Sequence, residues 1–190
     1  MKRWVLMLAL VAALCGGQAA MAGPRADAIA GIGVSLSLPD GLSDADLTVT
    51  KDGCVILDTD TTGLIVCRFA DQPLRSKGDL LIMRKAWQEW LYAKLAVDPS
   101  SPMPSSAQSL APGQSLQQAV DAEFVTTANG LYGLPGSATF TGHDRTSVTI
   151  RTFTTAAPND DAIVLVVATH PDSAAGEGDY HRIVGTLAFI

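Results

Sequence analysis

Two short apolar segments around one polar turn constrain the fold of this chain more than any other feature. Residues 55–57 and 64–66 flank the turn-rich residues 58–63, and Cys54 and Cys67 stand at the outer ends. Pairing the two segments as an antiparallel hairpin places Cys54 directly opposite Cys67. At a non-hydrogen-bonded pair, opposed Cβ atoms lie close enough for a disulfide. We therefore predict a cross-strand Cys54–Cys67 disulfide, with a pair of free buried thiols as the alternative.

The first 22 residues resemble a cleavable export signal. Lys2 and Arg3 precede an apolar run over 4–14, and residues 20–22 form the small-x-small pattern of a cleavage site. A run of this length is too short for a membrane-spanning helix, which needs about 20 residues. We expect residues 23–190 to be periplasmic or secreted, where a disulfide can form.

Cys15 raises the question of a lipid anchor, because it follows the apolar run. Leu14 precedes it, where lipoprotein processing favours a small residue. We therefore consider a lipid anchor at Cys15 unlikely and expect ordinary cleavage after Ala22.

Charge excludes several classes of partner. Residues 1–22 hold two of the 13 basic residues and none of the 19 acidic ones, so residues 23–190 carry a net charge of −8. Such a chain lacks the clustered Lys and Arg that nucleic acids or anionic membranes require. We expect no nucleic-acid partner and no membrane span.

The sequence predicts a single domain over residues 23–190. The segment 23–29 is expected to be a loose N-terminus, followed by strands at 33–39 and 47–50 that alternate apolar and polar residues. The hairpin strands are apolar on both faces, which favours interior positions in a sheet.

Two helices are predicted next. Residues 79–97 carry an apolar stripe at helical spacing that includes Trp87 and Trp90, and we interpret both tryptophans as core rather than as a ligand platform. The Ser/Pro-rich residues 98–115 form a loop. Ser115 and Gln118 then make a capping-box pattern, and we expect the helix that they start to end at Asn129-Gly130.

A meander of three strands is predicted after residues 134–136 (Leu-Pro-Gly). Its strands span 138–141, 147–154 and 162–169, and the last is apolar on both faces and therefore central. Residues 180–187 indicate a short helix that runs into a terminal strand. The whole pattern predicts an α+β fold, an antiparallel sheet with two to three helices packed on it.

Residues 38–41 (Leu-Pro-Asp-Gly) end the first predicted strand, and residues 183–189 form a terminal hydrophobic segment with a small hydroxylated residue. In these features the layout resembles the family that joins the photosystem extrinsic protein PsbP with bacterial envelope DcrB-like proteins. The resemblance implies a non-enzymatic accessory or binding domain of the envelope, with helices on both faces of an antiparallel sheet. It carries over no catalytic residue.

Motifs of the common enzyme and cofactor classes are absent from the sequence. It contains no Gly-x-Ser-x-Gly elbow, zinc pair, phosphate-binding glycine loop or dinucleotide fingerprint. Residues 58–63 imitate the start of an EF-hand loop, but Phe69 stands where the bidentate Glu belongs. We interpret these residues as a turn and expect no catalytic residue and no cofactor.

Three histidines form the weak candidate for a metal or acid–base site. His143, His170 and His181 each lie within two residues of an aspartate, and Asp172 follows His170. In a meander all three would lie at the same end of the sheet, and imidazole with carboxylate suits zinc. The alternative is that these are ordinary polar loop residues, so no metal site is firmly assigned.

Three functions remain open. The leading hypothesis is an exported, non-enzymatic binding or accessory protein of the bacterial envelope with an unidentified protein partner. The second is a periplasmic immunity or inhibitor protein against a secreted toxin or enzyme. The third is a small metal-dependent hydrolase that uses the histidine and aspartate cluster.

Overall fold

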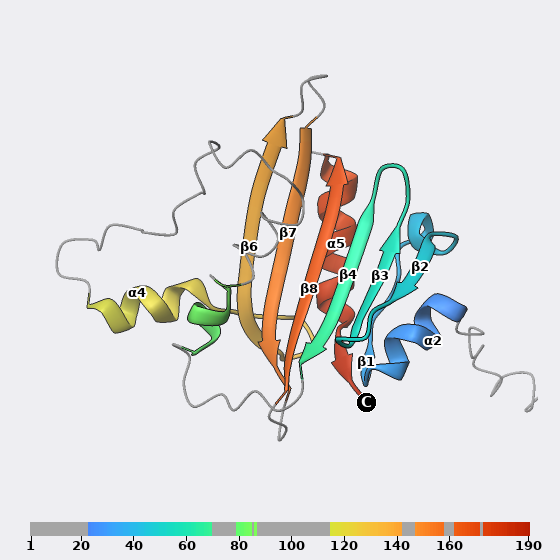
Figure 1. The fold of residues 1–190 in the computed structure, drawn as a ribbon. Helices are drawn as coiled ribbons and strands as arrows, with labels where there is room; N and C mark the ends of the chain where they lie inside the picture. Colours follow the sequence, from blue (N-terminus) through green and yellow to red (C-terminus); the bar gives the residue numbers. More distant parts are fainter. Residues whose placement is uncertain are drawn as a thin grey trace, which may run out of the picture.

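The structure is a computed structural model that describes residues 23–69, 79–84, 86, 115–141, 147–157, 162–171 and 173–190. Its centre is an antiparallel sheet of seven strands (Figure 1). In spatial order these are β2 (Asp46–Val49), β3 (Cys54–Asp58), β4 (Gly63–Phe69), β8 (Ile163–Pro171), β7 (Ser147–Ala156), β6 (Tyr132–Thr141) and β5 (Val125–Thr126). A second sheet pairs β1 (Val34–Ser35) with β9 (Ala188–Phe189).

Helices complete the α+β fold. They are α2 (Pro24–Gly31), the 3-10 helix η1 (Asp40–Leu42), α4 (Leu116–Glu123) and α5 (Ala174–Thr186). Residues 79–84 and 86 are also helical, which confirms the start of the predicted helix over 79–97; its remainder, with Trp87 and Trp90, lies outside the described residues. The loop predicted at 98–115 also lies there, except for Ser115.

The hairpin has the register that the sequence predicts. Cys54 pairs with Cys67, and Leu57 pairs with Leu64. The two cysteines form a disulfide with their Cα atoms 4.0 Å apart. Both strands are interior, because β2 flanks β3 and β8 flanks β4. A turn closes the hairpin, with the Thr59 amide donating to the Thr62 carbonyl over 2.9 Å, as expected for residues 58–63.

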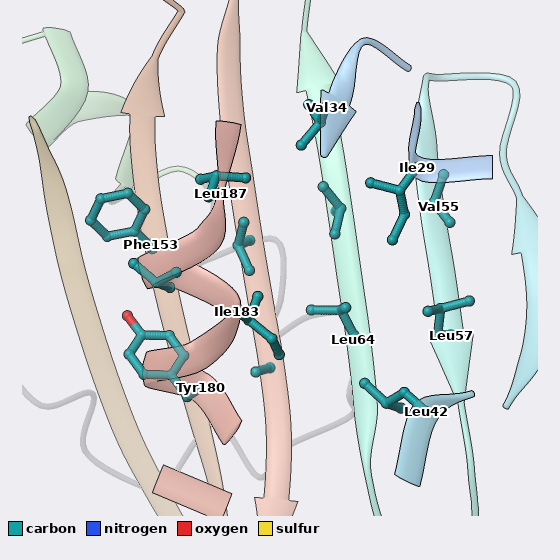
Figure 2. Packing of buried hydrophobic residues seen from close by; sticks show 14 of the residues in the cluster. Ile29, Val34, Leu42, Val55, Leu57, Leu64, Phe153, Tyr180, Ile183 and Leu187 are labelled. Carbon is teal, nitrogen blue, oxygen red and sulfur yellow. The ribbon is translucent and has the colours of Figure 1, made fainter. Parts of the chain in front are cut away.

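The core lies mainly on one face of the sheet, which we call the α5 face. There, side chains of α2, η1 and α5 pack onto β3, β4, β7 and β8 (Figure 2). The labelled residues include Ile29, Leu42, Leu57, Phe153 and Ile183. β8 is central, as its apolar pattern predicts, and its alternate residues Val164 and Val166 belong to this core.

The opposite face carries the disulfide. Cys54 and Cys67 pack there with Ile150, Leu165 and Val167. Farther along the same face, Leu80 and Phe124 pack against Leu134 and Ile163. An ion pair of 2.5 Å between Arg84 and Glu123 joins residues 79–84 to the end of α4. Apolar side chains on both faces explain why β3, β4 and β8 lack alternation.

Two expectations for the N-terminal part were wrong. Residues 23–29 are not loose, because Pro24 begins α2 and Ile29 is buried in the core. Proline suits the first turn of a helix, since its missing N–H has no partner there. The strand expected at 33–39 shortens to the two residues of β1, where it pairs with β9.

Two further expectations failed around β6. The second helix ends at Glu123, and Asn129-Gly130 instead makes the turn between β5 and β6, with Gly130 at a φ of 84°. A positive φ is readily adopted by glycine. The first strand of the meander, expected at 138–141, already begins at Tyr132, so residues 134–136 are part of β6. Pro135 is tolerated because β5 covers only Tyr132 and Gly133 of this outer strand.

Candidate functional site

Helix α5 forms one wall of a larger and of a smaller hollow on the α5 face of the sheet. It begins at Ser173, whose hydroxyl accepts a hydrogen bond of 3.2 Å from the Gly176 amide, a regular N-cap. Its buried residues Tyr180 and Ile183 face the sheet (Figure 2), and Val184 belongs to the same core. The helix therefore lies along the α5 face of the sheet and leaves space beside it, toward the outer strands β5 and β6.

That space is a groove with a volume of about 710 Å³, which we call the α5 groove. Strands β5, β6 and β7 provide its floor, and the flank of α5 provides its wall. Its lining residues are Val125, Thr126, Thr127, Ala128, Pro135, Gly136, Ser137, Arg151, Phe153, Tyr180, His181, Val184 and Gly185. Its volume lies within the range of about 300–1,000 Å³ that is typical of small-molecule sites.

One end of the groove is held by the turn between β5 and β6. The side-chain amide of Asn129 donates a hydrogen bond to the carbonyl of Leu187, directly after α5. The Thr127 hydroxyl donates to Asn129 and accepts from the Leu131 amide over 3.0 Å. These bonds connect the floor of the groove to the end of its wall.

Arg151 is the charged residue of the groove. It lies on β7 directly opposite Ser137 of β6, and both line the groove. Its Nη2 lies 3.1 Å from Oε1 of Glu177, while its Nε is buried without a hydrogen-bond partner. The guanidinium carbon lies 5.7 Å from the centre of the Tyr180 ring, within range of a cation–π contact.

Tyr180 separates two hollows. Its hydroxyl donates a hydrogen bond of 2.9 Å to the Thr152 carbonyl. Burial raises the pKa of Tyr180 to about 12, and the positive charge of Arg151 partly offsets this rise. The phenol is therefore neutral at physiological pH and serves as a wall and a hydrogen-bond donor to the sheet.

The second hollow, the His170 pocket, is smaller, with a volume of about 220 Å³. It lies between the first turns of α5, η1 and the ends of β4 and β8. Its polar lining residues include Thr62, His170, Ser173 and Asp179. Nδ1 of His170 lies 2.7 Å from the Pro171 carbonyl, and its Nε2 is buried without a hydrogen-bond partner.

Close packing explains the burial of His170. Gly176 of α5 lies so near its ring that an added Cβ would stand 2.2 Å from Nδ1. Only glycine permits this approach of α5 to β8. His170 therefore has a structural role in seating the first turn of the helix.

The structure separates the candidate metal ligands that it describes. His170 is buried in its own pocket, whereas His181 lies on the third turn of α5, is largely exposed and lines the α5 groove. Nε2 of His181 lies 3.7 Å from Oε1 of Glu177, the same oxygen that Arg151 approaches. His143 and Asp172 lie outside the described residues. Across the described part of the chain, no three His, Cys, Asp or Glu side chains are grouped to hold a metal ion.

Sequence reasoning missed the residues that make the groove. Arg151 stands inside the predicted strand 147–154, two positions from Phe153 and therefore on its face of the strand. Because Ser147 and Thr149 share this face with it, whereas Val148 and Ile150 lie on the other, the alternation along the strand gave no sign that Arg151 borders a hollow. Ser137 and Gly185 gave no signal, since their importance depends on elements distant in sequence.

Comparisons with known proteins define no family for this chain. No protein-family profile matches it, and no curated protein matches it. A crystal structure from Bacteroides thetaiotaomicron is similar to it, with a TM-score of 0.47 and 13% identity. The match covers 83% of this chain but 45% of that one, so this chain spans less than half of the similar protein.

No helix in the described part of the chain combines the length and the apolar composition that crossing a bilayer would require.

Proposed function

We propose that this protein is an exported, non-enzymatic binding protein of the bacterial envelope that holds its ligand in the α5 groove. The observation that carries the proposal is the groove itself, a largely apolar hollow between α5 and strands β5–β7. Apolar hollows with a few convergent polar groups are the usual form of small-ligand sites. Arg151, Ser137 and His181 supply those polar groups.

Export is supported by two independent features. The sequence of residues 1–22 resembles a signal peptide, and Cys54 and Cys67 form a disulfide. Disulfides persist mainly in oxidising compartments. The alternative of a histidine-dependent hydrolase gains no support, because His170 and His181 line different hollows.

Two glycines of α5 allow a matched test of binding in the groove. Gly185 lines the groove and Gly178 does not, and an added Cβ would meet nothing within 4 Å at either position. Gly185→Leu would fill the groove, whereas Gly178→Leu adds the same side chain elsewhere on the helix. Both changes raise helix propensity, so neither should unfold α5.

The probe is the neutral fluorescent compound N-phenyl-1-naphthylamine, whose emission rises in apolar surroundings. We expect the oxidised protein and the Gly178→Leu variant to bind it with a stoichiometry of one. Gly185→Leu should weaken this binding at least about ten-fold, because a branched side chain occupies the space. Equal binding by all three proteins, or no binding to the unmodified protein, would refute the groove as the binding site.

A further inference from the structure

We infer that the ligand of the α5 groove is an amphiphile with an apolar body and a single carboxylate head, and that Arg151 and Ser137 bind the head. This inference deepens the proposed function and rests on it. It depends on the donors that the groove presents, on its charge, and on the shape of its apolar part.

The donors of Arg151 are incompletely used. A guanidinium has five N–H groups, and the described residues supply one carboxylate, Glu177, to its Nη2. The buried Nε donor has no acceptor. A buried charged donor without an acceptor is unfavourable, so an acceptor brought by a ligand would be stabilised there. Ser137, directly across from Arg151 on β6, adds a hydroxyl at the same place.

The ion pair between Arg151 and Glu177 can give way to a ligand. The Glu177 side chain is 50% exposed and does not line the groove. Exposed ion pairs contribute little net stability, since water and salt compete with them. A ligand carboxylate within the groove would be less exposed to water than Glu177 and could replace it as the partner of the guanidinium.

The charge of the groove selects an anion. Its ionisable lining residues are Arg151, His181 and the neutral Tyr180, and none of its described lining residues is Asp or Glu. This contrasts with the chain, in which acidic residues outnumber basic ones by 19 to 13. A cationic ligand would meet the guanidinium inside the groove, while the carboxylate that pairs with it, Glu177, lies outside the lining, and the like charges would oppose binding.

The shape of the groove selects the rest of the ligand. Most of the accessible surface of the lining is apolar, and it includes the side chains of Val125, Phe153 and Val184 and the small residues Ala128 and Gly185. One planar guanidinium with one hydroxyl matches the two oxygens of a carboxylate. A phosphate dianion is better served by clusters of backbone amides or several cations, which this lining does not provide.

The test compares three head groups on one apolar chain. Decanoate, decylammonium and 1-decanol would each compete with N-phenyl-1-naphthylamine for the oxidised protein, below their aggregation concentrations. We expect decanoate to bind at least about ten-fold more tightly than either of the others, as one charged hydrogen-bonded pair predicts. Equal affinity of the three would overturn the inference while leaving groove binding intact.

Two variants identify the residue that is responsible. Arg151→Gln should lower the affinity for decanoate to that for 1-decanol. Arg182→Gln removes a positive charge from α5 at a position that does not line the groove, and should leave this affinity unchanged. Binding of the naphthylamine probe by Arg151→Gln shows that its groove has formed. If Arg151→Gln does not fold, the affinity of the Glu177→Gln variant for decanoate tests the inference instead. It should strengthen decanoate binding because it removes the competing carboxylate, and unchanged or weaker binding would contradict the inference.

Discussion

Gly176 shows how a single residue sets the distance between a helix and a sheet. Its lack of a side chain lets α5 contact the ring of His170, and a Cβ would overlap Nδ1 at 2.2 Å. At Gly178, two residues further along the same helix, an added Cβ would meet nothing within 4 Å. Packing against His170 therefore requires glycine at position 176, whereas no steric contact requires glycine at position 178.

We expect Gly176→Ala to lower the free energy of unfolding by about 1–3 kcal/mol, because the new methyl group overlaps the imidazole. In the His170→Ala background the same change should be neutral or stabilising, since the overlap is gone and alanine favours the helix by about 1 kcal/mol. Urea denaturation of the four proteins measures this coupling. Gly178→Ala is the control and should stabilise; equal destabilisation at both glycines would contradict the packing argument.

Tyr180 predicts a dependence of stability on alkaline pH. Its pKa is raised to about 12 in the folded protein, mainly by burial, from an ordinary value of 10.0. The folded state therefore retains the phenolic proton more tightly than the unfolded chain. This contribution is fully present below pH 10 and is lost as the pH rises from about 10 to 12, by roughly 1.4 kcal/mol for each unit.

The measurement is urea denaturation at pH 8, 10 and 11. Tyr180→Phe should be less stable than the unmodified protein by about 1 kcal/mol at pH 8, because it lacks the hydrogen bond to Thr152. This difference in the free energy of unfolding should shrink above pH 10, because ionisation of the phenol is less favourable in the folded protein than in the unfolded chain. A constant difference across this range would show that the phenol titrates normally.

Among the elements, α4 depends for its stability on Ser115, the N-cap residue that directly precedes it. Ser115 accepts a hydrogen bond of 3.2 Å from the Gln118 amide, and the Gln118 side chain accepts one of 2.9 Å from the Ser115 amide. A helix of eight residues is too short to be stable by itself, so its cap matters. The ion pair between Arg84 and Glu123 connects the last residue of α4 to residues 79–84.

Ser115→Ala should destabilise α4 by about 1 kcal/mol, since one amide of its first turn loses its acceptor. Amide hydrogen exchange within residues 116–123 should become faster, with little change in β8. Ser115→Thr keeps an acceptor oxygen and is the matched control. Exchange that is as fast in the threonine variant as in the alanine variant would assign the effect to something other than the cap.

At the scale of the whole protein, we predict that the Cys54–Cys67 disulfide forms only when the chain is exported from the reducing cytoplasm. Expression of the full chain in a bacterial host should yield a periplasmic product with the mass of residues 23–190 and no free thiol. Leu8→Arg should interrupt the apolar run, retain the chain in the cytoplasm and leave Cys54 and Cys67 reactive toward alkylating reagents.

Cys15→Ser is the control for this experiment. Ordinary cleavage predicts that it changes neither export nor the mass of the product, whereas a lipid anchor would require Cys15. A cytoplasmic full-length product from the unmodified gene would contradict the export proposal. Removing both hairpin cysteines should also lower stability by about 3 kcal/mol, as expected for a loop of this size.

Local features were predictable because their determinants lie within a few residues of one another. The register that places Cys54 opposite Cys67 follows from the length of one turn, and the cap of α4 follows from Ser115 and Gln118. β8 was correctly predicted to be central, because its side chains are apolar toward both faces. The errors at α2 and Pro135 arose where distant packing or an open sheet edge outweighed local preference.

The α5 groove could not be predicted, for a physical reason. Its lining comes from residues 125–128, 135–137, 151, 153, 180, 181, 184 and 185. These residues meet only after β5, β6 and β7 have paired and α5 has returned across the sheet. Several strands here are apolar enough to pair in more than one order, and only the packing of the complete core selects among them. Spacing along the chain thus specifies the hairpin, the cap and the fold class. The position of Arg151 beside an apolar hollow arises from contacts between distant segments.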